Sequence, residues 1–211
     1  MIELILLAIT SLIVGFSGAI VPGPVFALTV SESVKIGFIA GPLIVAGHII
    51  IEAIVIVALI LGLGPILNTG ATVIIISFFG GLMLVWMGLR LVTTSFKKQV
   101  ELTCENKPPS KKYTTALGGI ILSVSNPYFF VWWATVGGSL LVRGMAVGLA
   151  GVIAFALGHW ASDLSWYSFV SLCVSRGKKL MGAKTYRIIL LACGGFLLVL
   201  GAIFLKGSFF T

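Results

Sequence analysis

Six long apolar stretches follow one another along the chain, separated by short segments that hold charged and turn-forming residues. A helix that crosses a bilayer needs about 20 mostly apolar residues, and each stretch reaches that length. The pattern therefore predicts an all-α integral membrane protein with six transmembrane helices. These stretches cover Ile2–Val30, Ile36–Leu63, Ala71–Ser95, Thr115–Val142, Met145–Val174 and Tyr186–Leu205.

The composition agrees with this assignment. Of 211 residues, 59% are hydrophobic and 9% are charged, and the mean hydropathy is +1.17. Soluble domains contain about 25% charged residues, so a water-soluble globular domain is excluded. A chain this apolar also cannot stay disordered in water. We therefore expect one transmembrane domain over residues 1–211, located in the cytoplasmic membrane.

The basic residues indicate how the spans are oriented. The formal net charge is +8, from 14 Lys and Arg against 6 Asp and Glu. With six spans, twelve of these basic residues fall on the side of the first, third and fifth connections, and only Arg143 and Lys206 fall on the other side. Cytoplasmic loops are enriched in Lys and Arg, so we expect basic loops in the cytoplasm, both termini outside, and contact with anionic lipid head groups. The orientation of the spans therefore accounts for the positive net charge, and no nucleic-acid partner is needed to explain it.

The chain contains an internal repeat. Four residues of the second stretch have identical or chemically similar counterparts in the fifth stretch, at one constant offset of 111 positions. Three helices per copy is an odd number, so the second copy must be inverted, as is common in secondary transporters with a binding site at the membrane midplane. We expect repeats at 1–96 and 115–211, joined by a basic cytoplasmic linker at 97–114. The matching residues are Gly37, Gly47, His48 and Glu52, which correspond to Gly148, Gly158, His159 and Asp163.

Prolines interrupt the first and fourth stretches. The first contains Pro22, Gly23 and Pro24, and the fourth contains Asn126 and Pro127. A proline inside a helix removes a backbone donor and crowds the preceding turn, so we expect both spans to be broken. The helix that starts after each break presents free N–H groups and a positive dipole end, which suits a carboxylate. These five residues are the predicted substrate-binding residues, and the alternative is a packing kink without a ligand.

Two ionisable pairs lie deep in the predicted spans. His48 and Glu52 are four residues apart, as are His159 and Asp163, so each pair shares one helix face. Ionisable groups inside a membrane are costly and usually functional. Imidazole titrates near neutral pH, and burial can bring a carboxylate into the same range. The pairs are therefore predicted to carry a coupling proton or to face a cation, and the alternative is that each pair only locks helices together.

Other notable residues receive no functional assignment. Cys104, Cys173 and Cys193 form no CxxC motif, so neither a disulfide framework nor a thiolate metal site is expected. Four glycines with helix-contact spacing are interpreted as packing residues, and four tryptophans as interfacial or packing residues. No phosphate-binding loop or catalytic triad motif is present, so we predict no enzyme activity and no cofactor. The glycines are Gly37, Gly41, Gly144 and Gly148, and the tryptophans are Trp132, Trp133, Trp160 and Trp166.

Three motifs stand out together. They are Pro22–Gly23–Pro24 in the first stretch, the segment from Ser31 to His48, and Ser125–Asn126–Pro127 in the fourth stretch. With these motifs, its length and its inverted halves, most of the chain resembles the lysine exporter family of small six-span proteins that export amino acids. Many members have an acidic residue directly after the first motif, where this chain has Val25, so the resemblance names no particular amino acid. The wider superfamily also includes a thiol-redox carrier with cysteines in spans 1 and 4, which are absent from those stretches here.

These observations favour a secondary transporter that exports an amino acid or similar small zwitterion, coupled to protons. Its partners would be the substrate, protons and the lipid bilayer. The sequence leaves open whether the protein forms a homo-oligomer. The alternative is divalent-metal efflux, which also occurs in the superfamily, because imidazole and carboxylate suit borderline metals. A membrane scaffold is disfavoured because it needs no paired ionisable groups. The metal ligands would be His48, Glu52, His159 and Asp163.

Overall fold

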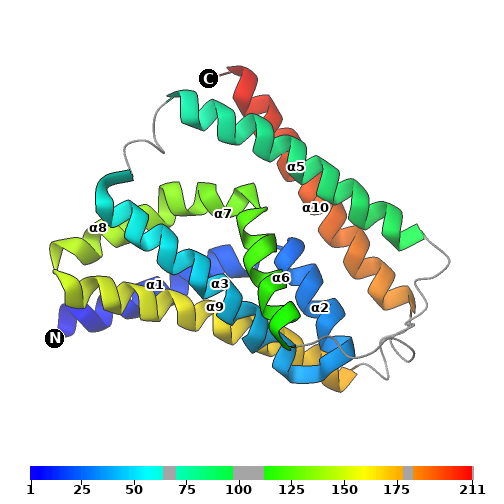
Figure 1. Cartoon of the computed structure of the whole chain (residues 1–211), viewed down its shortest axis with the longest axis horizontal. Coiled ribbons are helices and arrows are strands. Elements are labelled where there is room, and N and C mark those ends of the chain that lie inside the picture. Colours follow the sequence, from blue (N-terminus) through cyan, green and yellow to red (C-terminus); the bar gives the residue numbers. More distant parts are fainter. Residues whose placement is uncertain (64–69, 97–111, 178–182, 211) are drawn as a thin grey trace.

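The computed structural model describes residues 1–63, 70–96, 112–177 and 183–210, and the regular structure in these ranges is all helical (Figure 1). Residues 97–111, most of the predicted linker, lie outside the described residues, and the last three linker residues begin helix α6. The elements are α1 (Ile2–Ala19), α2 (Pro24–Ile36), a 3₁₀ turn (Gly37–Ile39), α3 (Ala40–Ala58), a π-helical turn (Leu59–Leu63), α5 (Gly70–Phe96), α6 (Lys112–Val124), α7 (Pro127–Trp132), a second π-helical turn (Trp133–Gly137), α8 (Gly138–Ala146), α9 (Leu149–Gly177) and α10 (Ala183–Phe210).

Five helical segments of the described chain are long and apolar enough to cross a membrane, as expected for an integral membrane protein. The sequence predicts six spans, and the fifth of them, Met145–Val174, has no counterpart among these segments. Polar residues such as His159 and Asp163 lower the hydropathy of the corresponding helix, α9. The second half of the first predicted span also continues into the second as one helical run, which moves a boundary without changing the number of segments. The five segments are Ile2–Ala19, Pro24–Gly62, Ser77–Phe96, Pro127–Ala146 and Arg187–Ser208.

The helices pack mainly in three pairs. α5 and α10 lie side by side along one edge of the molecule, α1 packs against α9, and α3 packs against α6 (Figure 1). Gly47 of α3 faces the carbonyl oxygen of Ala116 in α6, and a Cβ at Gly47 would collide with that oxygen. Gly158 of α9 faces the carbonyl oxygen of Ala8 in α1 in the same way. Small residues allow helix backbones to approach this closely in membranes.

Replacing Gly47 by alanine should weaken the contact between α3 and α6. The added methyl group would meet backbone atoms of Ala116, which cannot move aside as a side chain can, and overpacking costs about 1–3 kcal/mol. The expected result is a lower midpoint of thermal unfolding in detergent. Gly195→Ala is the control, because nothing lies within 4 Å of a Cβ at that position. Equal midpoints for the two variants would contradict the close contact.

Two of the four glycines that were interpreted as packing residues make close helix contacts. Gly41 and Gly144 each face backbone atoms of α9. Gly37 and Gly148 differ from the expectation: a Cβ on either would have nothing within 4 Å, and their φ angles are +75° and +83°. Residues with side chains rarely adopt this conformation. These two glycines therefore form the turns that precede α3 and α9.

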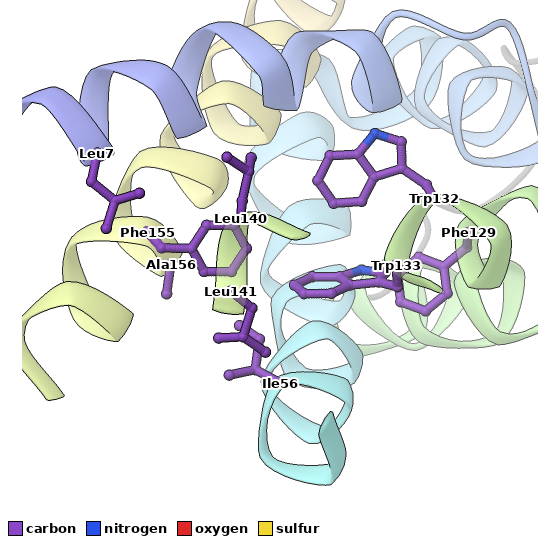
Figure 2. Packing of buried hydrophobic residues seen from close by; sticks show 9 residues of the cluster. All are labelled: Leu7, Ile56, Phe129, Trp132, Trp133, Leu140, Leu141, Phe155 and Ala156. Carbon is purple, nitrogen blue, oxygen red and sulfur yellow. The ribbon is translucent and has the colours of Figure 1, made fainter. Parts of the chain in front are cut away.

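The main apolar core lies where α1, α3, α8 and α9 meet the helix that follows the second break (Figure 2). Trp133 and Phe155 are its largest fully buried members, with 1% and 0% of their surfaces exposed. This core holds the start of α7 and the adjoining π-helical turn against the rest of the molecule. The cluster consists of Leu7, Ile56, Phe129, Trp132, Trp133, Leu140, Leu141, Phe155 and Ala156.

Candidate functional site

Both predicted helix breaks are present. α2 begins at Pro24 and α7 begins at Pro127, each after a short non-helical segment. In both cases proline takes the first helical position, where its missing N–H is not needed. The preceding residues, Gly23 and Asn126, have extended backbones, and the side-chain oxygen of Asn126 accepts a hydrogen bond from the Tyr128 N–H at 3.2 Å. Each break therefore creates a new helix N-terminus within the protein.

The two ionisable pairs meet in one cluster. α3 contributes His48 and Glu52, α9 contributes His159 and Asp163, and none of the four side chains is more than 13% exposed. Glu52 Oε1 lies 2.7 Å from His159 Nε2 and 3.3 Å from His48 Nε2. Asp163 Oδ2 is 3.6 Å from His159 Nε2, which is too long for a hydrogen bond. The four-residue spacing places each pair on one face, and helix packing brings the two faces together.

A serine of α6 extends this cluster, and the sequence interpretation did not include it. His48 Nδ1 lies 2.5 Å from Ser123 Oγ. The Ser123 hydroxyl donates its proton to the Gly119 carbonyl at 2.6 Å, so His48 Nδ1 is the donor in the first contact. Ser123 is fully buried. Its position three residues before Asn126, in an otherwise apolar stretch, is the signal that could have identified it.

A cavity of about 50 Å³ lies between the cluster and the two helix starts. Gly23 and Asn126 line it together with all four ionisable residues, whereas Pro22, Pro24 and Pro127 do not. Two of the five predicted substrate-binding residues therefore face the cavity. The prolines that begin α2 and α7 contribute indirectly, by ending one helix and starting the next.

Aromatic side chains form much of the cavity wall. Trp132 stacks on the His159 ring with centroids 4.5 Å apart, and Trp133 meets the same ring edge-on at 5.5 Å. Both tryptophans belong to the segment after the second break and are labelled in Figure 2. The interpretation of the tryptophans as packing residues is thus incomplete for these two, while Trp160 and Trp166 lie outside the lining. The aromatic lining residues are Tyr128, Phe129, Trp132, Trp133 and Tyr167.

The cavity contains buried acceptor atoms without partners. Within the described ranges, Glu52 Oε2 and Asp163 Oδ2 have no hydrogen-bond partner, and neither does His159 Nδ1. None of the residues that line this cavity is Lys or Arg. Buried polar atoms nearly always have a partner, so the arrangement suits an ammonium group, a proton or a metal ion. For a metal ion, ligand atoms of His48, Glu52 and Asp163 lie within 4.8 Å of one another.

Comparison with known proteins identifies the family. The chain is 23% identical over 194 residues to YcgF of Bacillus subtilis, which is provisionally named an amino acid efflux protein, and the match covers 92% of each chain. It is 25% identical over 201 residues to the chemotactic transduction protein ChpE of Pseudomonas aeruginosa, covering 94% of this chain and 97% of that protein. No solved structure gives a significant match.

A family model supports the same conclusion over nearly the whole length. The model of the LysE type translocator family matches residues 16–208, a range that includes both helix breaks and the entire ionisable cluster. The predicted resemblance to lysine exporters is therefore confirmed. The chain belongs to the LysE type translocator family, whose members are membrane transporters and not enzymes.

Proposed function

We propose that this protein is a secondary transporter that exports an amino acid or similar small zwitterion across the cytoplasmic membrane, coupled to the inward movement of protons. Family membership and the similarity to YcgF support export of small molecules. The observation that carries the proposal is the cavity, where two buried carboxylates face two helix starts.

The two ends of a zwitterion match the two sides of this cavity. The helices that begin at Pro24 and Pro127 place positive dipole ends beside Gly23 and Asn126, and such ends favour a carboxylate. On the other side, the carboxylates can face an ammonium group or take up a proton. A buried negative charge without a partner is strongly disfavoured, so substrate and proton both stabilise the site when they bind.

The helix contacts support six spans in two inverted repeats. In this arrangement α1–α2 and α6–α8 are the broken spans, α3 and α9 are the second and fifth spans, and α5 and α10 are the third and sixth. Exchanging the two repeats converts the contact of α1 with α9 into the contact of α6 with α3, and both contacts occur. The close approach of Gly47 to Ala116 has its counterpart in that of Gly158 to Ala8. These matching contacts support the proposed repeats.

Orientation follows from the charge distribution and can be tested at Cys104, which lies outside the described residues. With basic loops in the cytoplasm, a membrane-impermeant thiol reagent should not label Cys104 in intact cells and should label it in inside-out vesicles. The experiment uses a variant in which Cys173 and Cys193 are serine, so that Cys104 is the remaining cysteine. A further variant without Cys104 is the control, and labelling of Cys104 in intact cells would reverse the orientation.

Transport by the purified protein in proteoliposomes tests the function directly. We expect a pH gradient to drive accumulation of amino acids from a radiolabelled mixture, and a protonophore to abolish it. Liposomes without protein are the control. The cluster of metal-ligand atoms favours divalent-metal efflux as the second candidate, so uptake of Zn²⁺ and Mn²⁺ is measured in parallel. Metal uptake without amino-acid movement would replace the proposal by this alternative.

A further inference from the structure

The two carboxylates of the cavity have different surroundings. Glu52 Oε1 faces the Nε2 atoms of both histidines, at 2.7 and 3.3 Å. Asp163 Oδ2 has no hydrogen-bond partner in the described part of the chain, and the nearest imidazole nitrogen is 3.6 Å away. Glu52 is therefore already engaged by protein groups, while Asp163 is available to a ligand.

The hydrogen bonds of His48 define where its proton lies. Because Ser123 donates to the Gly119 carbonyl, His48 Nδ1 must donate to Ser123 Oγ. A neutral His48 then directs the lone pair of Nε2 toward Glu52 Oε1, which is also an acceptor, at 3.3 Å. A second proton between these two atoms removes the repulsion. The geometry thus favours one additional proton shared by His48 and Glu52.

His159 lacks the corresponding hydroxyl. Ser123 lies seven residues after Ala116 in α6, and Gly15 lies seven residues after Ala8 in α1, so these positions correspond across the two matching helix contacts. A Cβ on Gly15 would lie 2.9 Å from His159 Nδ1, but glycine offers no acceptor, and this nitrogen has no partner in the described chain. The proton of a neutral His159 therefore lies on Nε2, the nitrogen that has an acceptor.

A cation that enters the cavity would meet an unpartnered oxygen of Asp163. Glu52 Oε2 and Asp163 Oδ2 belong to side chains that are 1% and 3% exposed and line the same cavity. An ammonium group has three N–H donors, and one of them can bond to Asp163 Oδ2. Trp132 and Trp133 line the same cavity, and aromatic faces attract cations.

We infer that the two carboxylates have separate roles: Asp163 binds the ammonium group of the substrate, and Glu52 carries the coupling proton together with His48. Ser123 is a positioning residue, because it holds the proton of His48 on Nδ1. This inference rests on the proposed function and deepens it by making a primary amine the group that the site recognises. The other titratable groups that line the cavity with His48 are Glu52 from α3, His159, Asp163 and Tyr167 from α9, and Tyr128 from α7.

Comparing exchange with driven transport separates the two roles. Exchange of a radiolabelled amino-acid mixture against the same unlabelled mixture needs no net proton movement, whereas accumulation driven by a pH gradient does. Glu52→Gln should keep exchange within about threefold of the parent and lose driven accumulation. Asp163→Asn should lose both by roughly tenfold or more, as expected for loss of a hydrogen bond between charged groups. Methylammonium should inhibit exchange by the parent protein, and acetate should inhibit it less.

Ser123→Ala tests the positioning role without removing an ionisable group. Driven accumulation should shift its pH dependence, because His48 can then place its proton on either nitrogen. Ser162→Ala is the control: Ser162 is equally buried and lies beside the cluster, but its hydroxyl donates to the carbonyl of His159. A pH profile that is identical in the two variants would overturn the role of Ser123.

The remaining outcomes distinguish the inference from the proposed function. A parent protein that exchanges no amino acid would overturn the proposed function, and the inference with it. A parent that exchanges amino acids, with Glu52→Gln and Asp163→Asn impaired equally in exchange and in driven accumulation, would overturn the separation of roles alone. Stronger inhibition by acetate than by methylammonium would contradict recognition of the amine. Normal amounts of each variant in detergent extracts exclude a folding defect.

Discussion

Export of amino acids against a gradient should fall by roughly tenfold to hundredfold in both Glu52→Gln and Asp163→Asn, since a hydrogen bond to a charged group contributes about 1.5–3 kcal/mol. Both substitutions keep the size of the side chain and remove a buried charge that faces the cavity. The measurement is efflux of radiolabelled amino acids from preloaded cells. Glu32→Gln is the matched control, because Glu32 is also buried but pairs with Lys35 outside the cavity.

The histidines distinguish amino-acid export from metal efflux. If the cargo is an amino acid, His48→Ala and His159→Ala should reduce export less than the carboxylate substitutions, because the imidazoles contact Glu52 and only tune its hold on the coupling proton. If the cargo is a metal ion, loss of an imidazole ligand should be as damaging as loss of a carboxylate ligand. Equal loss of metal efflux in all four variants, from a parent that moves no amino acid, would contradict the proposed function. His159→Gln is measured as well, because the His159 ring stacks on Trp132. Glutamine removes this ring but keeps a polar side chain, so the variant separates loss of stacking from loss of polarity.

Local signals in the sequence predict part of the candidate site. The four-residue spacing of His48 and Glu52 places them on one helix face, whatever that helix packs against. Pro24 and Pro127 likewise begin helices for reasons that depend on their own backbone chemistry. The mean hydropathy of α9 is a weaker signal than this spacing and these prolines, because the polar residues that α9 contributes to the site lower its mean hydropathy.

The remaining features of the site depend on how the helices are rotated and on how closely they approach. Ser123 reaches His48 because Gly119, one turn earlier on α6, lies against the Ile44 carbonyl of α3. Trp132 points into the cavity because the core around α7 sets its direction. The position of Ser123 close to Asn126 marks it as a candidate, but its contact with His48 and the direction of Trp132 both arise from contacts between segments that are distant in the sequence. For the same reason, spacing alone could not reveal that Gly37 forms a turn and not a helix contact.

Removing the second helix break should also impair transport strongly. Pro127→Ala restores a backbone N–H and frees Asn126 from the extended conformation that a following proline imposes, so α6 can continue into α7 as one helix. The helix start beside Asn126 would then be lost from the cavity. A helix N-terminus contributes up to about 2 kcal/mol to binding of a negative group in partly buried sites, so export should fall by roughly tenfold to thirtyfold. Efflux of labelled amino acids measures this loss, and membrane insertion should be unchanged.

Pro42→Ala is the control for the second helix break. Pro42 lies in the first turn of α3 and does not line the cavity, and N–H groups in a first turn have no partner within the helix. An additional N–H there changes no helix boundary, so export should stay near that of the parent. If Pro127→Ala exported as well as Pro42→Ala, the substrate carboxylate would not depend on the start of α7. The start of α2 at Pro24 would then be the one helix N-terminus left to bind it.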